Sequence, residues 1–220
     1  MMEINLSQAK HFSFDLWLTL IASNPKFKPK RDQLFKDFFS IEKSIEDVGK
    51  VLRQFDILAN KISEITGVHF DANQIYCLAL KELKVDIEKI SSEELNLFQY
   101  EVEHLFIQNK PMLIDPNIKN LFQKIRNQNK TMSLLSNTAF IRGKQLKNVL
   151  QDYDLSSYFE FQIYSDEIGF SKPNKEVFDV LFKEINKIKT IKKNEIMHIG
   201  DNKIADYNGA IDYGFKAILI

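Results

Sequence analysis

The sequence predicts an α/β fold, in which a doubly wound, Rossmann-like parallel sheet carries an inserted all-helical domain. Two observations support this prediction. Short apolar runs alternate with helical patterns over the second half of the 220-residue chain. Between residues 25 and 110, in contrast, the pattern is helical throughout. Because strands that alternate with helices form parallel sheets, the helical stretch is best explained as an insert after the first strand.

The strands are predicted from five apolar runs rich in Ile, Leu and Phe, each bounded by polar or glycine-containing turns. These runs are residues 12–16, 131–135, 161–164, 196–199 and 216–220. Amphipathic helices are predicted between the later runs, one after Asp115-Pro116 and one after Pro173. The order of strand and helix therefore indicates a doubly wound sheet.

The helical stretch shows four apolar faces, at residues 34–39, 48–62, 75–83 and 95–106. Asp71 with Gln74, and Ser91 with Glu94, have the spacing of capping boxes at helix starts. We predict a core domain of residues 1–22 and 111–220 and a helical cap domain of residues 23–110. Two connections would join the cap to the core, which is the geometry expected of a hinged lid.

Composition limits the classes of partner and compartment. The chain has 30 basic and 30 acidic residues, so no net charge favours nucleic acid or an anionic membrane. The only cysteine, Cys77, cannot form an internal disulfide and is expected to be a small core residue. The first twenty residues show no leader pattern and no apolar run has the length of a membrane span, so a cytoplasmic protein is expected. Nothing in the sequence indicates an oligomeric state.

Polar side chains follow the predicted strands, where open α/β sheets bind ligands. They are Asp15 and Thr19, Ser136 and Asn137, Lys172, and Asp201 and Asp206. Each also has an ordinary structural interpretation, such as a helix cap, a surface charge or a turn residue. Their occurrence together at successive strand ends favours a functional site.

These motifs resemble those of the haloacid dehalogenase-like superfamily, most of whose members are Mg²⁺-dependent phosphatases. The resemblance covers an apolar strand ending in Asp, a strand ending in Ser, a Lys followed by Pro, and Gly-Asp with a second Asp five residues later. It implies a small phosphorylated metabolite as substrate and Mg²⁺ as cofactor. The implied roles are nucleophile for Asp15, phosphoryl and substrate binding for Thr19, Ser136, Asn137 and Lys172, and metal binding for Asp201 and Asp206.

Physical chemistry supports these roles. A carboxylate such as Asp15 can accept a phosphoryl group directly, because it is already ionised near neutral pH. Mg²⁺ prefers oxygen ligands, which Asp15, Asp201 and the backbone carbonyl of Trp17 would supply, with support from Asp206. Lys172 and the Ser136 hydroxyl would stabilise negative charge during the transfer.

Trp17 departs from the motif, because it stands where a second Asp is expected two residues after the nucleophile. An indole can neither protonate a leaving alkoxide nor activate water. Loss of a general acid–base group typically lowers the rate about 100- to 10,000-fold. Leu18, where many relatives have glycine, is a milder departure.

Four functions remain open on this sequence. A phosphatase is favoured, followed by a haloacid dehalogenase, whose halide leaving group needs no acid. A phosphonate hydrolase with a cap lysine and a pseudoenzyme that binds a phosphorylated ligand or a protein are the others. The basic stretch KFKPKR, residues 26–31, is interpreted as a solvated helix start, with attraction of an anionic substrate as the alternative.

Overall fold

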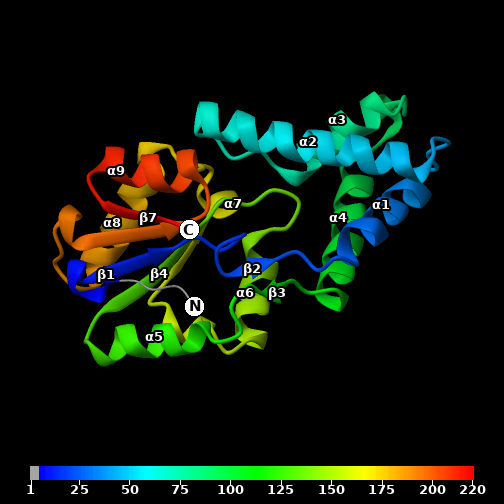
Figure 1. Ribbon diagram of the computed structural model, residues 1–220. Helices are drawn as coiled ribbons and strands as arrows, with labels where there is room; N and C mark the ends of the chain where they lie inside the picture. The colour runs from blue at the N-terminus through cyan, green and yellow to red at the C-terminus, as the bar shows by residue number, and fades with distance from the viewer. Residues whose placement is uncertain (1–4) are drawn as a thin grey trace.

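A five-stranded parallel sheet forms the centre of the part of the molecule on the left in Figure 1. The structure is a computed structural model and describes residues 5–220. The strand order is β5–β4–β1–β6–β7. Their bounds are β1 (His11–Phe14), β4 (Thr131–Ser136), β5 (Gln162–Tyr164), β6 (Ile196–Gly200) and β7 (Lys216–Leu219). The predicted doubly wound fold is confirmed, and each predicted strand lies within two residues of an observed one.

Helices cover both faces of this sheet because successive side chains of a strand point to opposite faces. Leu134 packs in the same hydrophobic cluster as α5 and α6, whereas Leu135 packs with α8 and α9. The helices are α5 (Ile118–Asn127), α6 (Gly143–Asp152), α7 (Ser165–Ile168), α8 (Lys175–Ile188) and α9 (Gly209–Tyr213). A π-helix, η5 (Lys203–Asn208), precedes α9, and short 3-10 helices are η1 (Leu6–Gln8), η2 (Ile87–Lys89), η3 (Ser156–Tyr158) and η4 (Lys193–Glu195).

Four helices between the first two strands of the sheet form a separate group, which we call the helical insert (Figure 1). They are α1 (Phe27–Phe38), α2 (Ile45–Thr66), α3 (Ala72–Glu82) and α4 (Ser92–Gln108). The capping boxes predicted at Asp71 and Ser91 are confirmed at the starts of α3 and α4. The short strands β2 (Ile21–Ala22) and β3 (Met112–Leu113) pair antiparallel, so the two connections of the insert run side by side. The domain limits at residues 22 and 110 stay a prediction.

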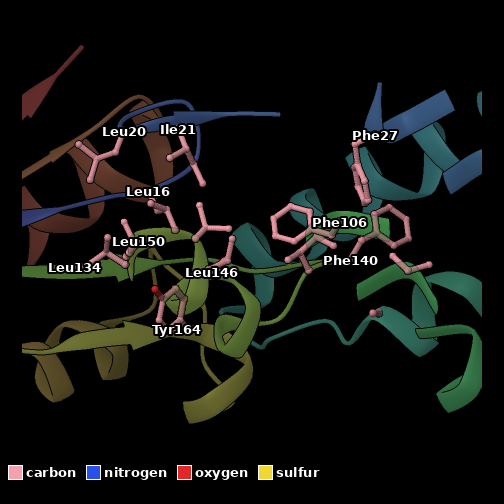
Figure 2. Packing of buried hydrophobic residues seen from close by; sticks show 14 of the residues in the cluster. Leu16, Leu20, Ile21, Phe27, Phe106, Leu134, Phe140, Leu146, Leu150 and Tyr164 are labelled. Atoms are coloured by element: carbon pink, nitrogen blue, oxygen red, sulfur yellow. The ribbon is translucent and has the colours of Figure 1, made fainter. Parts of the chain in front are cut away.

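One hydrophobic cluster extends from the sheet into the insert (Figure 2). Leu16 and Leu134 belong to its sheet end, and Phe27 and Phe106 belong to the insert. Phe27 and Phe106 pack edge to face with ring centroids 5.4 Å apart. Cys77, on α3, is half-buried against this cluster rather than fully enclosed in it. Continuous apolar packing therefore holds the insert beside the strand ends.

A second contact, which we call the clasp, joins residues 67–69 of the insert to residues 169–171 of the sheet domain. The His69 amide donates to the carbonyl of Gly169 (3.0 Å), and the Ser171 amide donates to the carbonyl of Gly67 (2.9 Å). Gly67 has a φ of 70°, and a Cβ there would lie 2.4 Å from Nδ2 of Asn174. Only glycine meets both conditions at this position. The segment that precedes Lys172 is thus fixed to the insert.

No helix within residues 5–220 combines the length and the apolar character that crossing a bilayer demands.

Candidate active site

The strand order brings the predicted site residues together at the carboxyl ends of neighbouring parallel strands. β1 lies between β4 and β6, and the chain reverses its direction of winding at this point. Asp15 directly follows β1, Asn137 follows β4 and Asp201 follows β6. The Asp15 amide donates to the carbonyl of Ile199 (2.8 Å), which continues the β1–β6 pairing up to the acid. Such switch points are where open α/β sheets bind ligands.

Lys172 joins two of the predicted site carboxylates. Its Nζ donates to Oδ1 of Asp15 (2.7 Å), to Oδ1 of Asp206 (2.6 Å) and to the carbonyl of Leu135 (2.8 Å). Only 1% of its surface is exposed. All three N–H donors of the ammonium are therefore satisfied, as burial of such a charge requires.

The two carboxylates differ in electrostatic environment. Burial raises the pKa of Asp15 to about 7, although Lys172 acts to lower it. Burial also acts to raise the pKa of Asp206, but Lys172 and His198 together hold it well below its usual range. Asp206 accepts three hydrogen bonds, from Lys172, from His198 Nε2 (3.0 Å) and from the Asn202 amide (3.0 Å). The negative charge is therefore more stable on Asp206 than on Asp15.

Local structure after β6 explains the position of Asp206. A Cβ at Gly200 would lie 2.2 Å from the Asp206 carboxyl carbon, so glycine is required where the chain leaves the strand. The Asn202 side chain accepts hydrogen bonds from the amides of Ile204 and Ala205 and caps the π-helix. That helix, a form that occurs frequently at functional sites, turns Asp206 back toward the strand end.

A possible metal site follows from three of these acids. One carboxylate oxygen from each of Asp15, Asp201 and Asp206 lies within 4.8 Å of the other two. Asp201 is half-buried, and burial followed by the charge of Asp206 raises its pKa. Crowded carboxylates repel each other, and a divalent cation would relieve this repulsion. An all-oxygen donor set fits Mg²⁺.

Of the three other predicted site residues, one lines the cavity and two are buried. Asn137 lines the cavity described below and exchanges two hydrogen bonds with the backbone of Lys172, of 2.8 and 3.0 Å. Ser136 is buried, and its hydroxyl donates to the carbonyl of Asn137 (3.1 Å). Thr19 is buried as well, and its hydroxyl oxygen has no hydrogen-bond partner within residues 5–220. Neither Ser136 nor Thr19 is among the residues that line the cavity, and their contact with substrate stays a prediction.

Trp17 and Leu18, two and three residues after Asp15, line the cavity. The Trp17 ring lies 6.3 Å from that of Phe106 on α4, so the indole packs against the insert. Leu18 has a φ of 59°, in the left-handed region that favours glycine, and 61% of its surface is exposed. A bulky residue there carries backbone strain. The two departures from the motif thus add apolar side chains to the same cavity that Asp15 lines.

A cavity of about 610 Å³ opens over these residues. The strand-end loops contribute Asp15, Asn137, Lys172, Asp201 and Asp206 to its lining. The insert contributes residues of α1 and α2. The volume lies within the range of about 300–1,000 Å³ that is typical of small-molecule sites.

A family model described as haloacid dehalogenase-like hydrolase matches residues 9–214. The chain belongs to this family. The resemblance predicted from the motifs is therefore confirmed, and the protein is a haloacid dehalogenase-like (HAD) hydrolase.

Curated relatives agree with this assignment. The uncharacterized hydrolase C7D4.05 of Schizosaccharomyces pombe is 30% identical over 88 residues, which cover 39% of this chain and 37% of that protein. The rhythmically expressed gene 2 protein of Drosophila melanogaster is 33% identical over 76 residues, 34% of this chain and 29% of that protein. Glyceraldehyde 3-phosphate phosphatase of Pyrococcus furiosus is 23% identical over 198 residues, 82% of this chain and 78% of that protein. The chain thus spans about a third of the length of the first two relatives.

Solved structures share the fold. YfnB, a HAD hydrolase from Bacillus subtilis bound to magnesium, superimposes with a TM-score of 0.73 at 18% identity, covering 97% of this chain and 89% of that chain. A HAD phosphatase from Thermococcus onnurineus gives 0.65 at 19% identity, covering 96% and 86%. L-2-haloacid dehalogenase from Xanthobacter autotrophicus gives 0.62 at 15% identity, covering 96% and 77%. At these identities the comparison shows the fold alone.

Sequence reasoning missed several residues of the site. His198 lies inside β6, where its side chain bonds both Ser13 Oγ (3.0 Å) and Asp206. Glu64, on α2, accepts a hydrogen bond from the Asn202 side chain (2.6 Å) and connects the insert to the loop after β6. Alternation along the strand would have placed His198 on the same face as Ile196, but no local signal indicates its partner.

Proposed function

We propose that this HAD hydrolase is a Mg²⁺-dependent phosphatase that acts on a small phosphorylated metabolite through an aspartyl phosphate on Asp15. The observation that supports this proposal best is the shared contact of Lys172 with Asp15 and Asp206, beside the third carboxylate of Asp201. Three acids and one buried cation at a strand edge suit phosphoryl transfer, because that reaction depends on charge stabilisation and positioning. Displacement of halide needs no such metal-binding group.

The residues present fit Mg²⁺, since Asp15, Asp201 and Asp206 offer closely spaced oxygens and the Trp17 carbonyl would add a fourth. When bound, the ion would neutralise negative charge that otherwise separates the nucleophile from the phosphate. Asp15 would attack phosphorus while the bond from phosphorus to the ester oxygen breaks, and water would later release inorganic phosphate. Lys172 would hold the Asp15 carboxylate ionised and oriented.

Trp17 shapes the expected substrate preference. No carboxylate stands at residue 17 to protonate the departing oxygen, so leaving groups that are weak bases should react best. No carboxylate at residue 17 can activate water either, which would slow breakdown of the aspartyl phosphate. We therefore expect faster turnover of aryl or acyl phosphates than of alkyl phosphates.

The proposal is tested by measuring phosphate release from a panel of aryl, acyl and alkyl phosphates, with Mg²⁺ and with EDTA. Turnover that requires Mg²⁺ and is lost in Asp15→Asn is expected, together with a phosphoenzyme detected by intact mass. Asp154→Asn is the matched control, because that carboxylate is 86% exposed and, within residues 5–220, pairs with Lys119 alone. Halide release from 2-haloacids in place of phosphate release would support the dehalogenase alternative. Phosphate release that persists in Asp15→Asn would refute the nucleophile assignment.

A further inference from the structure

The cavity has a group of cations on the helical insert that the proposed chemistry does not use. Lys28 and Arg31 lie on α1, and Arg53 lies on α2. We call these three residues the insert cations. They belong to different helices from the strand-end carboxylates, and Lys172 already provides the cation that contacts Asp15. The insert cations are therefore available to another part of the ligand.

Two carboxylates accompany the insert cations and are already paired. Asp32 accepts from both Nε (3.0 Å) and Nη2 (2.7 Å) of Arg31. Asp56 accepts from Nη1 of Arg53 (2.9 Å). Lys61 and Glu64 of α2 also line the cavity, so the insert side has four cations and three carboxylates, which leave one net positive charge. Within residues 5–220 Lys28 has neither an ion pair nor a hydrogen-bonded side-chain partner.

Arg31 has unused donors although it is buried. Only 4% of its surface is exposed, and both of its hydrogen bonds end on a single oxygen of Asp32. Its guanidinium stacks 4.5 Å from the centroid of the Phe140 ring, which fixes its plane. The Nη1 group, with two N–H donors, has no acceptor within the described residues, yet Arg31 lines the cavity. Because Arg31 lines the cavity, these donors are open to a ligand oxygen, and charge-assisted hydrogen bonds of this kind are strong.

Part of the cavity lining is apolar. Trp17, Leu18, Phe27 and Ile57 contribute to it, and Leu18 and Ile57 are 61% and 52% exposed. Exposed aliphatic side chains inside a cavity favour a ligand that covers them. The volume of about 610 Å³ exceeds what a phosphoryl group alone would fill.

We propose that the substrate is a phosphate monoester whose organic part is largely apolar and carries a second anionic group, a carboxylate or another phosphoryl group, which Lys28 and Arg31 bind. This inference rests on the proposed function for the position of the ester at Asp15. The second anion fixes the ester in the cavity from the insert side, so the helical insert selects the substrate class. Only part of the basic stretch at residues 26–31 would contact the ligand, because Lys28 and Arg31 line the cavity whereas Lys26 and Lys30 do not.

The test uses three ligands that cannot be hydrolysed, namely propylphosphonate, 3-phosphonopropanoate and propane-1,3-bisphosphonate, titrated by calorimetry with Mg²⁺. Wild-type protein should bind one or both of the two-anion ligands about tenfold or more tightly than propylphosphonate. The ligand that gains more identifies the second anion as carboxylate or phosphoryl. Lys28→Met and Arg31→Met should each reduce this ratio several-fold.

Lys30→Met is the matched control, since Lys30 lies on the same helix, bonds Asn109 Oδ1 (3.0 Å) and does not line the cavity. It should keep the wild-type ratio. Lys28 is exposed, so its substitution decides the question even if Arg31→Met fails to fold. Equal affinity for all three ligands, a ratio unaffected by Lys28→Met, or no binding of any phosphonate would overturn the proposal. Turnover is not required, so failure of the phosphatase assay would count against the proposed function and leave the binding ratio to decide this inference.

Discussion

Substitution of Lys172 by methionine should destabilise the protein in a pH-dependent way. The side chain is 1% exposed, and its ammonium bonds the carboxylates of Asp15 and Asp206 at 2.7 and 2.6 Å. Methionine fills a similar volume but leaves both acids buried without their cation. Loss of one partner from a buried ion pair typically lowers the free energy of unfolding by about 3–5 kcal/mol. We expect a loss of this size at pH 7.5 in EDTA.

The free energy of unfolding lost in Lys172→Met should be smaller at lower pH, because the pKa of Asp15 is raised in the folded protein. Its pKa is about 7 in the folded protein and 3.8 in the reference state, and removal of Lys172 raises the folded value further. A carboxyl with a raised pKa binds its proton more tightly in the folded state than in the unfolded state. Because the pKa is higher in the variant, the variant gains more stability than the wild type as the pH falls. Between pH 7.5 and 5.5 the difference from wild type should decrease by up to about 0.8 kcal/mol, because Asp15 of the wild type also takes up most of a proton over this range.

The assay is urea unfolding at both pH values, followed by circular dichroism and by the fluorescence of Trp17, the only tryptophan. Lys119→Met is the control, because Lys119 is 41% exposed and its partner Asp154 is 86% exposed. Exposed pairs contribute at most about 1 kcal/mol. A change below about 1 kcal/mol in Lys172→Met, or an equal change at the two pH values, would refute the reasoning.

Three further predictions concern the metal, the leaving group and a buried histidine. Asp201→Asn should weaken Mg²⁺ binding in calorimetry by about tenfold or more, whereas exposed Asp212→Asn should not, and equal affinity would remove Asp201 from the metal site. Trp17→Asp should raise hydrolysis of alkyl phosphates relative to aryl phosphates by about 100-fold in steady-state assays, and a uniform change in both would contradict the proton-donor argument. Burial lowers the pKa of His11 from 6.5 to about 3, so the folded state binds fewer protons and stability should fall below pH 6.5 by up to about 1.4 kcal/mol per pH unit. His11→Gln should reduce that slope in urea unfolding and exposed His104→Gln should keep it, and an unchanged slope in His11→Gln would argue against a neutral buried ring.

The helices of the insert were predictable because their signals are local. The capping residues Asp71 and Ser91 act within one turn of the helices that they start. The assembly of Asp15, Lys172 and Asp206 was also predictable, since parallel strands bring their carboxyl ends to one edge whatever the sequence between them. Hydrophobic periodicity and sheet topology were thus sufficient to predict most of the fold and the polar centre of the site.

The cavity lining on the insert was not predictable, because it depends on how helices pack against the sheet domain. One signal was present in α1, where Phe27, Arg31 and Phe35 are buried at intervals of four residues. A cation inside such an apolar stripe indicates a buried partner or a ligand. The hydroxyls of Ser136 and Thr19 show the opposite case, since their orientation depends on side-chain rotation that no spacing reveals.

The clasp limits how far the helical insert can move away from the sheet domain. To separate the insert from the sheet domain there, the molecule must break the two backbone hydrogen bonds of His69 and Ser171, along with the bond from Asn174 Nδ2 to the Gly67 carbonyl (3.1 Å). At about 0.5–1.5 kcal/mol each, these bonds together favour the closed arrangement by about 1.5–4.5 kcal/mol, so separated molecules form a minor population of less than about a tenth. Each separation also releases the amide of Ser171, the residue directly before Lys172, from the Gly67 carbonyl. We therefore expect movement of the insert to be coupled to the position of Lys172, and through it to the charge balance around Asp15.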